Sequence, residues 1–477
     1  MILTGGTIRT MDPERPVVDA LAIEGGRILD RSRGERIDLA GRCVVPGFTD
    51  SHAHFATWAL MRRRLRLEDC ETLEEAVEKV GAAAGSADGW LVGYGWRGAA
   101  WAREPTSADL DAVVGDVPVA LWSKDYHTLW LSSAAGGGPG LLRESAAWEF
   151  RDRHMTLPVE EYVDAVLEAI PVAHARGVTA IHDKDGWLGA LGIWQRVRAR
   201  GALTLRVWQS LPYERLDELE RLGLASGLGD EFLRAGYLKL FMDGTLGSGT
   251  ATMLSGGGIE ITSRGELERI VRRAARAGWP VAVHAIGDRA NRDALDAFEA
   301  TREEWQPRGL RQRIEHAQHV HPDDVARFGA LGVAVSAQFS HAMSDREVVD
   351  RQLPGEEVRT YAFRSQWDGG AVVANGSDAP IEELDPLAGI VAGARRTFDG
   401  RPPWRAHDAL TVEEALRAST VNPAWLAGDE HRRGKLVPGH DADLVVLDRD
   451  PVTDDLAAAR VVATMVAGRW VHGRLGE

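Results

Sequence analysis

Short apolar runs alternate with amphipathic helical patterns through the middle of the chain. The helical patterns, such as Glu266–Ala277 and Arg289–Glu304, repeat their apolar residues every three to four positions. This alternation is typical of βα units around a parallel sheet. Eight apolar runs are predicted strands, the number that closes a (β/α)₈ TIM barrel; they are Val44–Thr49, Val178–His182, Leu203–Gln209, Tyr237–Phe241, Val281–His284, Gln312–Glu315, Val333–Ala337 and Val372–Ala374.

The two ends of the chain share a different pattern, in which short β-like runs are separated by glycine turns. Val17–Ile23 is such a run near the start, and Arg460–Met465 is one near the end. We predict that residues 1–45 and 430–477 build one small β-sandwich domain, with the barrel between them over residues 46–429. Two unrelated β-hairpins are the alternative.

A long gap separates the first two predicted strands. Residues 65–157 contain a helical stretch, Leu73–Ala84, and a further strand, Val117–Ser123. The gap is too large for a simple crossover, so we predict an inserted α/β subdomain within the barrel of this α/β protein. The alternative counts Val117–Ser123 as a barrel strand and leaves one of the eight runs outside.

Composition narrows the functional classes. The chain has 477 residues, 44% of them hydrophobic, which is enough for a large core. Its net charge of -15 argues against a nucleic-acid partner, because such proteins meet phosphate with basic patches. Two cysteines, Cys43 and Cys70, provide no disulfide framework, so a cytoplasmic location is expected. No apolar stretch approaches the roughly 20 residues of a membrane helix, so we expect a small-molecule ligand and no membrane partner; a homodimer is compatible with the sequence.

The sharpest local signal is His52-Ala53-His54, which follows the first predicted strand. Side chains at positions i and i+2 of an extended segment point to the same side, so both imidazoles could bind one ion. An isolated His-x-His pair is weak evidence. Its position strengthens it, because active sites of barrels lie at the C-terminal ends of the strands.

Three more polar residues stand at ends of predicted strands. His284 and His316 each end an apolar run, and Asp378 follows the last one. A single core histidine is more often structural, but several at one mouth favour a metal site. Asp378 is placed to accept a proton from a metal-bound water.

Lys239 lies inside the apolar run Tyr237–Phe241. Most basic residues of this chain are arginines, so a lysine in such a run needs an explanation. A buried ammonium is costly unless it is paired or chemically changed. Reaction with CO₂ would give a carbamate that binds metal, whereas an ion pair with Asp243 or Glu315 would keep the lysine. The spacing alone leaves both interpretations open.

Several motifs in order carry a resemblance to a known family. They are PGFTDSHAHF (46–55), LKLFMDGTLGSGTA (238–251), VAVHAIGDRAN (281–291), RIEHAQHV (313–320), AQFSHAMSD (337–345), NGSDAPIEELDPL (375–387) and GKLVPGHDADLVVLDRDP (434–451). The chain resembles the amidohydrolase superfamily, in the branch of YtcJ-like proteins and N-substituted formamide deformylases.

The resemblance implies a barrel that holds one or two divalent ions. Imidazole nitrogens with oxygen ligands suit Zn²⁺ first, and Mn²⁺, Fe²⁺ or Co²⁺ next. Lys239 would be a carbamate bridging the ions, and Asp378 would be both ligand and catalytic base. The implied metal ligands are His52, His54, Lys239, His284, His316 and Asp378.

Other residues are candidates for supporting roles. Asp50 could orient a ligand histidine through its second ring nitrogen. His319 is expected on an exposed loop. The candidates for substrate binding are His127, His182, Asp243 and His341, and inert structural roles stay open for the three histidines.

The predicted function is hydrolysis of a carbon–nitrogen bond other than a peptide bond, through a metal-activated hydroxide. The substrate would be an amide, an N-formyl or N-acyl amine, or a cyclic amide. Ester hydrolysis, isomerisation or decarboxylation on the same barrel is the alternative, because a fold does not select its chemistry. A non-catalytic binding protein is disfavoured by the presence of every expected ligand together with Asp378.

Overall fold

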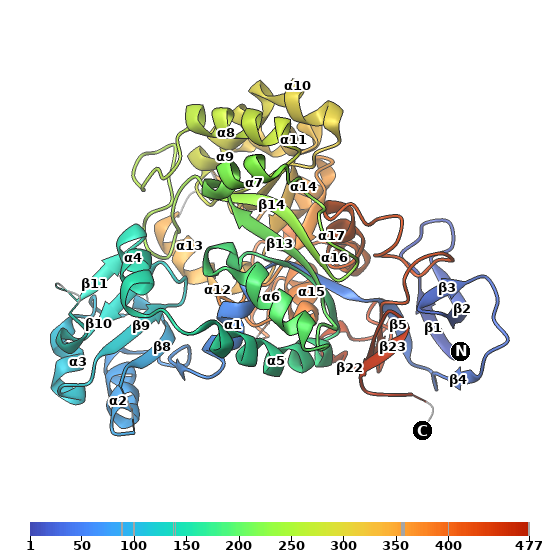
Figure 1. The fold of residues 1–477 in the computed structure, drawn as a ribbon, viewed down its shortest axis with the longest axis horizontal. Helices are drawn as coiled ribbons and strands as arrows, with labels where there is room; N and C mark the ends of the chain where they lie inside the picture. The colour runs from blue at the N-terminus through green and yellow to red at the C-terminus, as the bar shows by residue number, and fades with distance from the viewer. Residues whose placement is uncertain are drawn as a thin grey trace.

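A computed structural model describes residues 1–86, 89–98, 101–136, 138, 140–353, 358–398 and 400–475. Eight parallel strands form a near-closed barrel at its centre (Figure 1). The ring closes where the Asp378 backbone amide donates to the His52 carbonyl at 2.7 Å, and the His54 amide donates to the Ala379 carbonyl at 2.8 Å. In chain and spatial order the strands are β6 (Phe48–Ala53), β12 (Val178–Asp183), β13 (Arg206–Pro212), β14 (Leu233–Phe241), β15 (Val281–Ala285), β16 (Arg313–His316), β18 (Ala334–Ala337) and β20 (Val373–Asn375).

All eight predicted barrel strands overlap an observed one. The first run, Val44–Thr49, is divided by Gly47 into β5 (Cys43–Pro46) and β6. A Cβ atom on Gly47 would lie 2.3 Å from the Thr179 hydroxyl, so only glycine fits this junction. The chain therefore passes directly from the terminal sheet into the barrel.

Helices cover the barrel, and they are amphipathic in the way the sequence predicts. The buried face of α8 (Arg264–Arg276) includes Leu267 and Ile270, while its arginines face outward. The other helices outside the insertion are α1 (Phe55–Met61), α5 (Val159–Ala175), α6 (Ala190–Ala199), α7 (Leu216–Leu222), α9 (Asp288–Ala300), α10 (Arg302–Trp305), α11 (Pro322–Leu331), α12 (His341–Ser344), α13 (Arg346–Gln352), α14 (Phe363–Asp368), α15 (Pro386–Arg395), α16 (Val412–Ala418) and α17 (Val421–Leu426).

Both termini contribute to one mixed sheet, so the alternative of two unrelated hairpins is wrong. Strand β5 pairs with β21 (Leu444–Leu447), with Val45 opposite Val445. The predicted sandwich takes the form of a single hydrogen-bonded sheet. Its other strands are β1 (Ile2–Arg9), β2 (Val17–Glu24), β3 (Arg27–Leu29), β4 (Arg36–Asp38), β22 (Val461–Val466) and β23 (Arg469–His472).

The inserted segment has its own sheet, at the opposite end of the molecule from the terminal sheet (Figure 1). Val117–Ser123 corresponds to β9 (Val119–Ser123) of this sheet, so its alternative assignment to the barrel is wrong. The other elements are β7 (Leu65–Arg66), α2 (Leu73–Ala84), β8 (Leu91–Trp96), α3 (Ser107–Val114), β10 (Thr128–Leu131), β11 (Leu141–Arg143) and α4 (Ser145–His154). Among the described residues, no helix combines the length and apolarity that crossing a membrane requires.

Candidate metal centre

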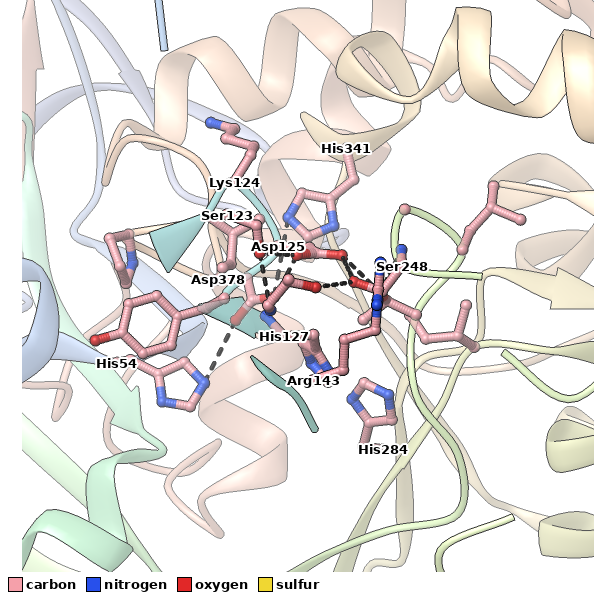
Figure 2. A pocket seen from close by; sticks show the side chains of 18 of the residues that line it. His54, Ser123, Lys124, Asp125, His127, Arg143, Ser248, His284, His341 and Asp378 are labelled. Atoms are coloured by element: carbon pink, nitrogen blue, oxygen red, sulfur yellow. Dashed lines mark hydrogen bonds and ion pairs between the residues drawn. The ribbon is translucent and has the colours of Figure 1, made fainter. Parts of the chain in front are cut away.

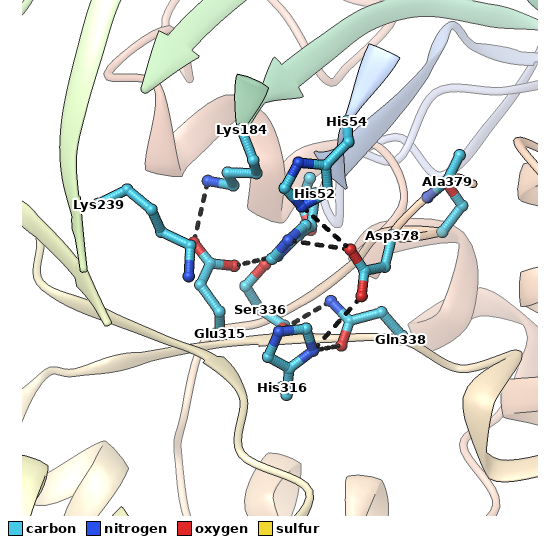
Figure 3. A network of polar contacts seen from close by, with 12 residues as sticks. His52, His54, Lys184, Lys239, Glu315, His316, Ser336, Gln338, Asp378 and Ala379 are labelled. Atoms are coloured by element: carbon cyan, nitrogen blue, oxygen red, sulfur yellow. Dashed lines mark hydrogen bonds and ion pairs between the residues drawn. The ribbon is translucent and has the colours of Figure 1, made fainter. Parts of the chain in front are cut away.

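Imidazoles converge on Asp378 where the barrel strands end (Figure 3). His52 and His54 approach one carboxylate oxygen, with Nε2–Oδ1 distances of 3.2 and 3.5 Å. His316 and His341 approach the other, at 4.0 Å from Nδ1 and 3.9 Å from Nε2 to Oδ2. Asp378 is therefore shared by two groups of potential ligands, and within each group the ligand atoms lie within 4.8 Å of one another.

Two of these histidines have a carboxylate behind them. The His52 Nδ1 lies 2.8 Å from Glu315 Oε2, and the His54 Nδ1 lies 3.0 Å from Asp185 Oδ1. An Nδ1–H that donates to a carboxylate leaves the Nε2 lone pair free, and here that nitrogen faces Asp378. The tautomer suited to metal binding is thus set by residues outside the cluster.

Glu315 has a second set of partners below the cluster. Its Oε1 lies 2.9 Å from Lys184 Nζ and 2.7 Å from Arg313 Nε, and all three side chains are completely buried. Burial alone would raise the pKa of Glu315, but Arg313 and His52 hold it well below its usual value. Glu315 is therefore a fixed anion beneath His52.

Lys239 lies in the same interior without a close acidic partner. Its Nζ is 4.1 Å from the centre of the Phe241 ring and 3.4 Å from the Leu240 carbonyl oxygen, and it pairs with no described carboxylate. Burial lowers its pKa to about 8. The alternative interpretation, an ion pair with Asp243 or Glu315, is not formed among the described residues, and Glu315 is occupied by Lys184 and Arg313.

His284 lies beside the cluster rather than within either ligand group. Its Nε2 donates to the Gly244 carbonyl at 3.1 Å, and its ring centre lies 4.6 Å from that of His316. The place beside His316 and Asp378 that the prediction gave to His284 is taken by His341.

Asp243 lies behind His284, outside the cavity where substrate contact was expected. Its carboxylate accepts the backbone amides of Ile286 and Gly287, at 3.0 and 2.9 Å, and of Thr252 at 2.9 Å. These bonds join the loops after β14 and β15. Asp243 thus holds the backbone around His284 in place.

Asp50 does not have the role predicted for it. Its Oδ1 accepts the backbone amide of His52 at 3.0 Å, and its two oxygens accept the amide of Ser377. It contacts backbone where the barrel closes, whereas Glu315 contacts the ring nitrogen of His52. The physical reason is that these backbone amides already engage the Asp50 carboxylate.

Two further histidines, His182 and His319, do not lie where the sequence predicts them. His182 accepts from the Arg313 guanidinium at 3.0 Å and borders a separate small cavity of about 20 Å³. His319 was expected to be exposed, but it is completely buried, with its Nδ1 3.0 Å from the Thr360 hydroxyl. Both are satisfied inside the protein.

A cavity of about 960 Å³ opens above the cluster (Figure 2). One wall comes from the inserted segment, where the His127 Nδ1 lies 2.7 Å from Glu144 Oε2. The other Glu144 oxygen accepts the Thr250 hydroxyl at 2.6 Å, and Asp125 accepts the Ser248 hydroxyl at 2.7 Å. These bonds fasten the insertion to the loop after β14, and His127 faces the cavity as predicted.

Comparison with known families fits this geometry. The model of the family described as "Amidohydrolase family" matches residues 35–472. The chain belongs to the amidohydrolase family. This confirms the resemblance inferred from the motifs, and a metal-dependent hydrolase is what the family and the histidine–aspartate cluster together support.

Several relatives resemble this amidohydrolase along nearly its whole length. It is 30% identical to Protein LONG AFTER FAR-RED 3 of Arabidopsis thaliana, over 99% of this chain and 91% of that protein. It is 29% identical to the putative amidohydrolase YtcJ of Bacillus subtilis (strain 168), over 98% of each. It is 26% identical to the N-substituted formamide deformylase of Arthrobacter pascens, over 100% and 99%.

A solved structure shares the architecture. An uncharacterized metal-dependent hydrolase from Pyrococcus horikoshii OT3 superposes with a TM-score of 0.79 at 28% identity. The match covers 96% of this amidohydrolase and 99% of the other chain. The barrel, the terminal sheet and the insertion therefore belong to a known arrangement.

Proposed function

We propose that this amidohydrolase cleaves a carbon–nitrogen bond other than a peptide bond, in an amide, an N-formyl or N-acyl amine, or a cyclic amide. The observation that carries the proposal is the convergence of four imidazoles on Asp378 at the floor of a large cavity. The similarity to an N-substituted formamide deformylase supports the choice of bond.

The residues of the cluster fit a divalent cation. Imidazole nitrogens with a carboxylate suit Zn²⁺ first, and Mn²⁺, Fe²⁺ or Co²⁺ next. The His341 Nε2 is buried and has no hydrogen-bond partner among the described residues, as expected of a nitrogen whose partner is an ion. His52, His54 and Asp378 would hold one ion. A second would be held by Asp378, His316 and His341, with His284 and a carbamate on Lys239 as further proposed ligands.

A bound cation would supply Lewis-acid chemistry, which polarises a carbonyl and makes water more acidic. Asp378 would accept the proton of the attacking water and return it to the leaving nitrogen. The Asp378 carboxylate lies at the centre of the cluster, 3.2 and 3.5 Å from the Nε2 atoms of His52 and His54, where it would meet the attacking water. His127, held by Glu144, would contact the substrate from the opposite wall.

A substrate panel with metal analysis tests this proposal. Purified protein should contain a divalent metal and should hydrolyse N-formyl, N-acyl or cyclic amides faster than matched esters. Activity should disappear after chelation and return with Zn²⁺ or Mn²⁺. Metal-free protein with full activity, or turnover confined to esters, would contradict it.

The carbamate has a separate test. Native mass spectrometry should show the added mass of one CO₂, and the Lys239→Met variant should lose both that mass and part of its bound metal. An unmodified Lys239 beside a fully loaded metal site would show that the carbamate proposal is wrong.

A further inference from the structure

Three aromatic side chains form a continuous surface in the cavity, which we call the aromatic shelf: Trp148, Trp187 and Phe241. The Phe241 ring centre lies 5.8 Å from that of Trp148 and 5.4 Å from that of Trp187. The three come from α4 of the insertion, from the turn after β12 and from the end of β14. Segments far apart in the sequence thus meet to build one apolar wall.

The aromatic shelf begins at the metal centre. The Phe241 ring lies 5.0 Å from the ring of His284, and Trp148 lies 5.3 Å from the ring of His127. These contacts place the rings beside the histidines that border the cluster, within reach of a substituent on a substrate held near Asp378. All three residues line the same 960 Å³ cavity.

The shelf is held in place by the protein, and part of it faces solvent. The Trp187 side chain lies near Glu214, and 40% of the residue is exposed. The Trp148 Nε1 donates to the Tyr126 carbonyl at 3.4 Å. The Trp148 N–H is thus already bonded to the protein, so its ring offers a ligand an apolar face, and the exposed Trp187 ring offers a second. Such faces gain free energy when a flat apolar group covers them.

We propose that the substrate carries a flat apolar substituent, such as an aromatic ring, close to the scissile amide, and that the aromatic shelf binds it. This inference rests on the proposed amide hydrolysis and names its substrate class. The cavity is in the size range that encloses a drug-sized molecule, far larger than a formyl or acetyl group requires.

Matched amides test the proposal. N-(2-phenylethyl)acetamide, N-(2-cyclohexylethyl)acetamide and N-ethylacetamide share the reacting group, and the first two have the same number of carbons but differ in flatness. A parallel series carries the same groups on the acyl side. We expect kcat/KM for the phenyl compound of at least one series to exceed that of the cyclohexyl compound about 5-fold and that of the ethyl compound about 30-fold.

Variants link that preference to the shelf. Trp187→Ala and Trp148→Ala should each raise KM for the preferred phenyl substrate about 10-fold, and raise it much less for the ethyl substrate. Trp470→Ala, which removes a half-buried indole from the terminal sheet, should change neither. Thermal unfolding of each variant checks that a loss does not come from misfolding.

Failure of this inference can be distinguished from failure of the proposed function. If the ethyl amides are hydrolysed as efficiently as both phenyl amides, the shelf proposal is overturned and amide hydrolysis stands. If no amide is turned over, calorimetric titration with the phenyl amides decides. Saturable binding that Trp187→Ala weakens would support the shelf, and binding equal to that of the ethyl amides would overturn it.

Discussion

The floor of the cavity and its outer wall differ in the kind of residues that form them and in how deeply these residues are buried. At the floor, completely buried charges meet one another, as where Glu315 pairs with Lys184, Arg313 and His52. At the wall, half-exposed aromatic rings stand beside hydroxyl groups that bond to Asp125 and Glu144. The floor belongs to the barrel, whereas much of the wall belongs to the insertion.

We infer that the floor determines the chemistry of the site, whereas the wall determines which substrates fit. A buried charge that loses its partner costs several kcal/mol, so the floor tolerates little change. A partly exposed ring or a single hydroxyl contributes less, and its loss mainly alters what fits.

Asp378→Asn should lower kcat by about 100- to 10,000-fold, because the amide cannot accept the proton and is a poorer ligand. Steady-state kinetics measure this, and circular dichroism should show a folded protein. Retention of full activity would show that Asp378 is not the base and that substitutions in the floor of the cavity can be tolerated.

Glu315→Gln should weaken metal affinity by about 10- to 100-fold, because the His52 tautomer loses its carboxylate partner. Lys184→Met should have a smaller effect, since Arg313 still pairs with Glu315. Metal titration gives both values. Glu104→Gln, at the exposed edge of the same cavity, is the matched control and should bind metal normally.

Glu144→Gln should leave metal content unchanged but raise KM about 3- to 10-fold, because a charge-assisted bond to His127 is lost. Glu144→Asp should not restore KM fully, since the shorter side chain cannot hold both His127 and Thr250. A fall in metal content would show that Glu144 supports the metal centre as well as the wall, contrary to the division between floor and wall.

Ser248→Ala should have the smallest effect, about 1 kcal/mol in the free energy of unfolding, because Asp125 keeps its bonds from Ser123 and Thr245. Chemical denaturation measures it. A large loss of activity would show that the attachment of the insertion matters to chemistry as well as to shape.

The barrel was predictable because strands buried on both faces appear as nearly continuous apolar runs. The cluster was partly predictable, since His52, His54, His316 and Asp378 all follow such runs. Lys184 and Glu315 were not recognised as partners, because that contact depends on which side chains point inward across the barrel. His341 is a substrate-binding candidate in the sequence, and its place beside Asp378 was not predictable. That distance depends on the turn after β18, whose conformation the residue pattern does not define.

The single-residue junction at Gly47 also bears on how the protein is made. Strand β5 precedes the strand of His52 and pairs with β21, so that Val45 lies opposite Val445. On the ribosome, β1 and the first barrel strand emerge early, yet β21, the second neighbour of β5, is translated only about 400 residues later. A nascent or truncated chain that lacks β21 therefore leaves β5, the segment that leads into the strand of His52, without one of its two neighbours, and metal loading is expected to follow translation of β21.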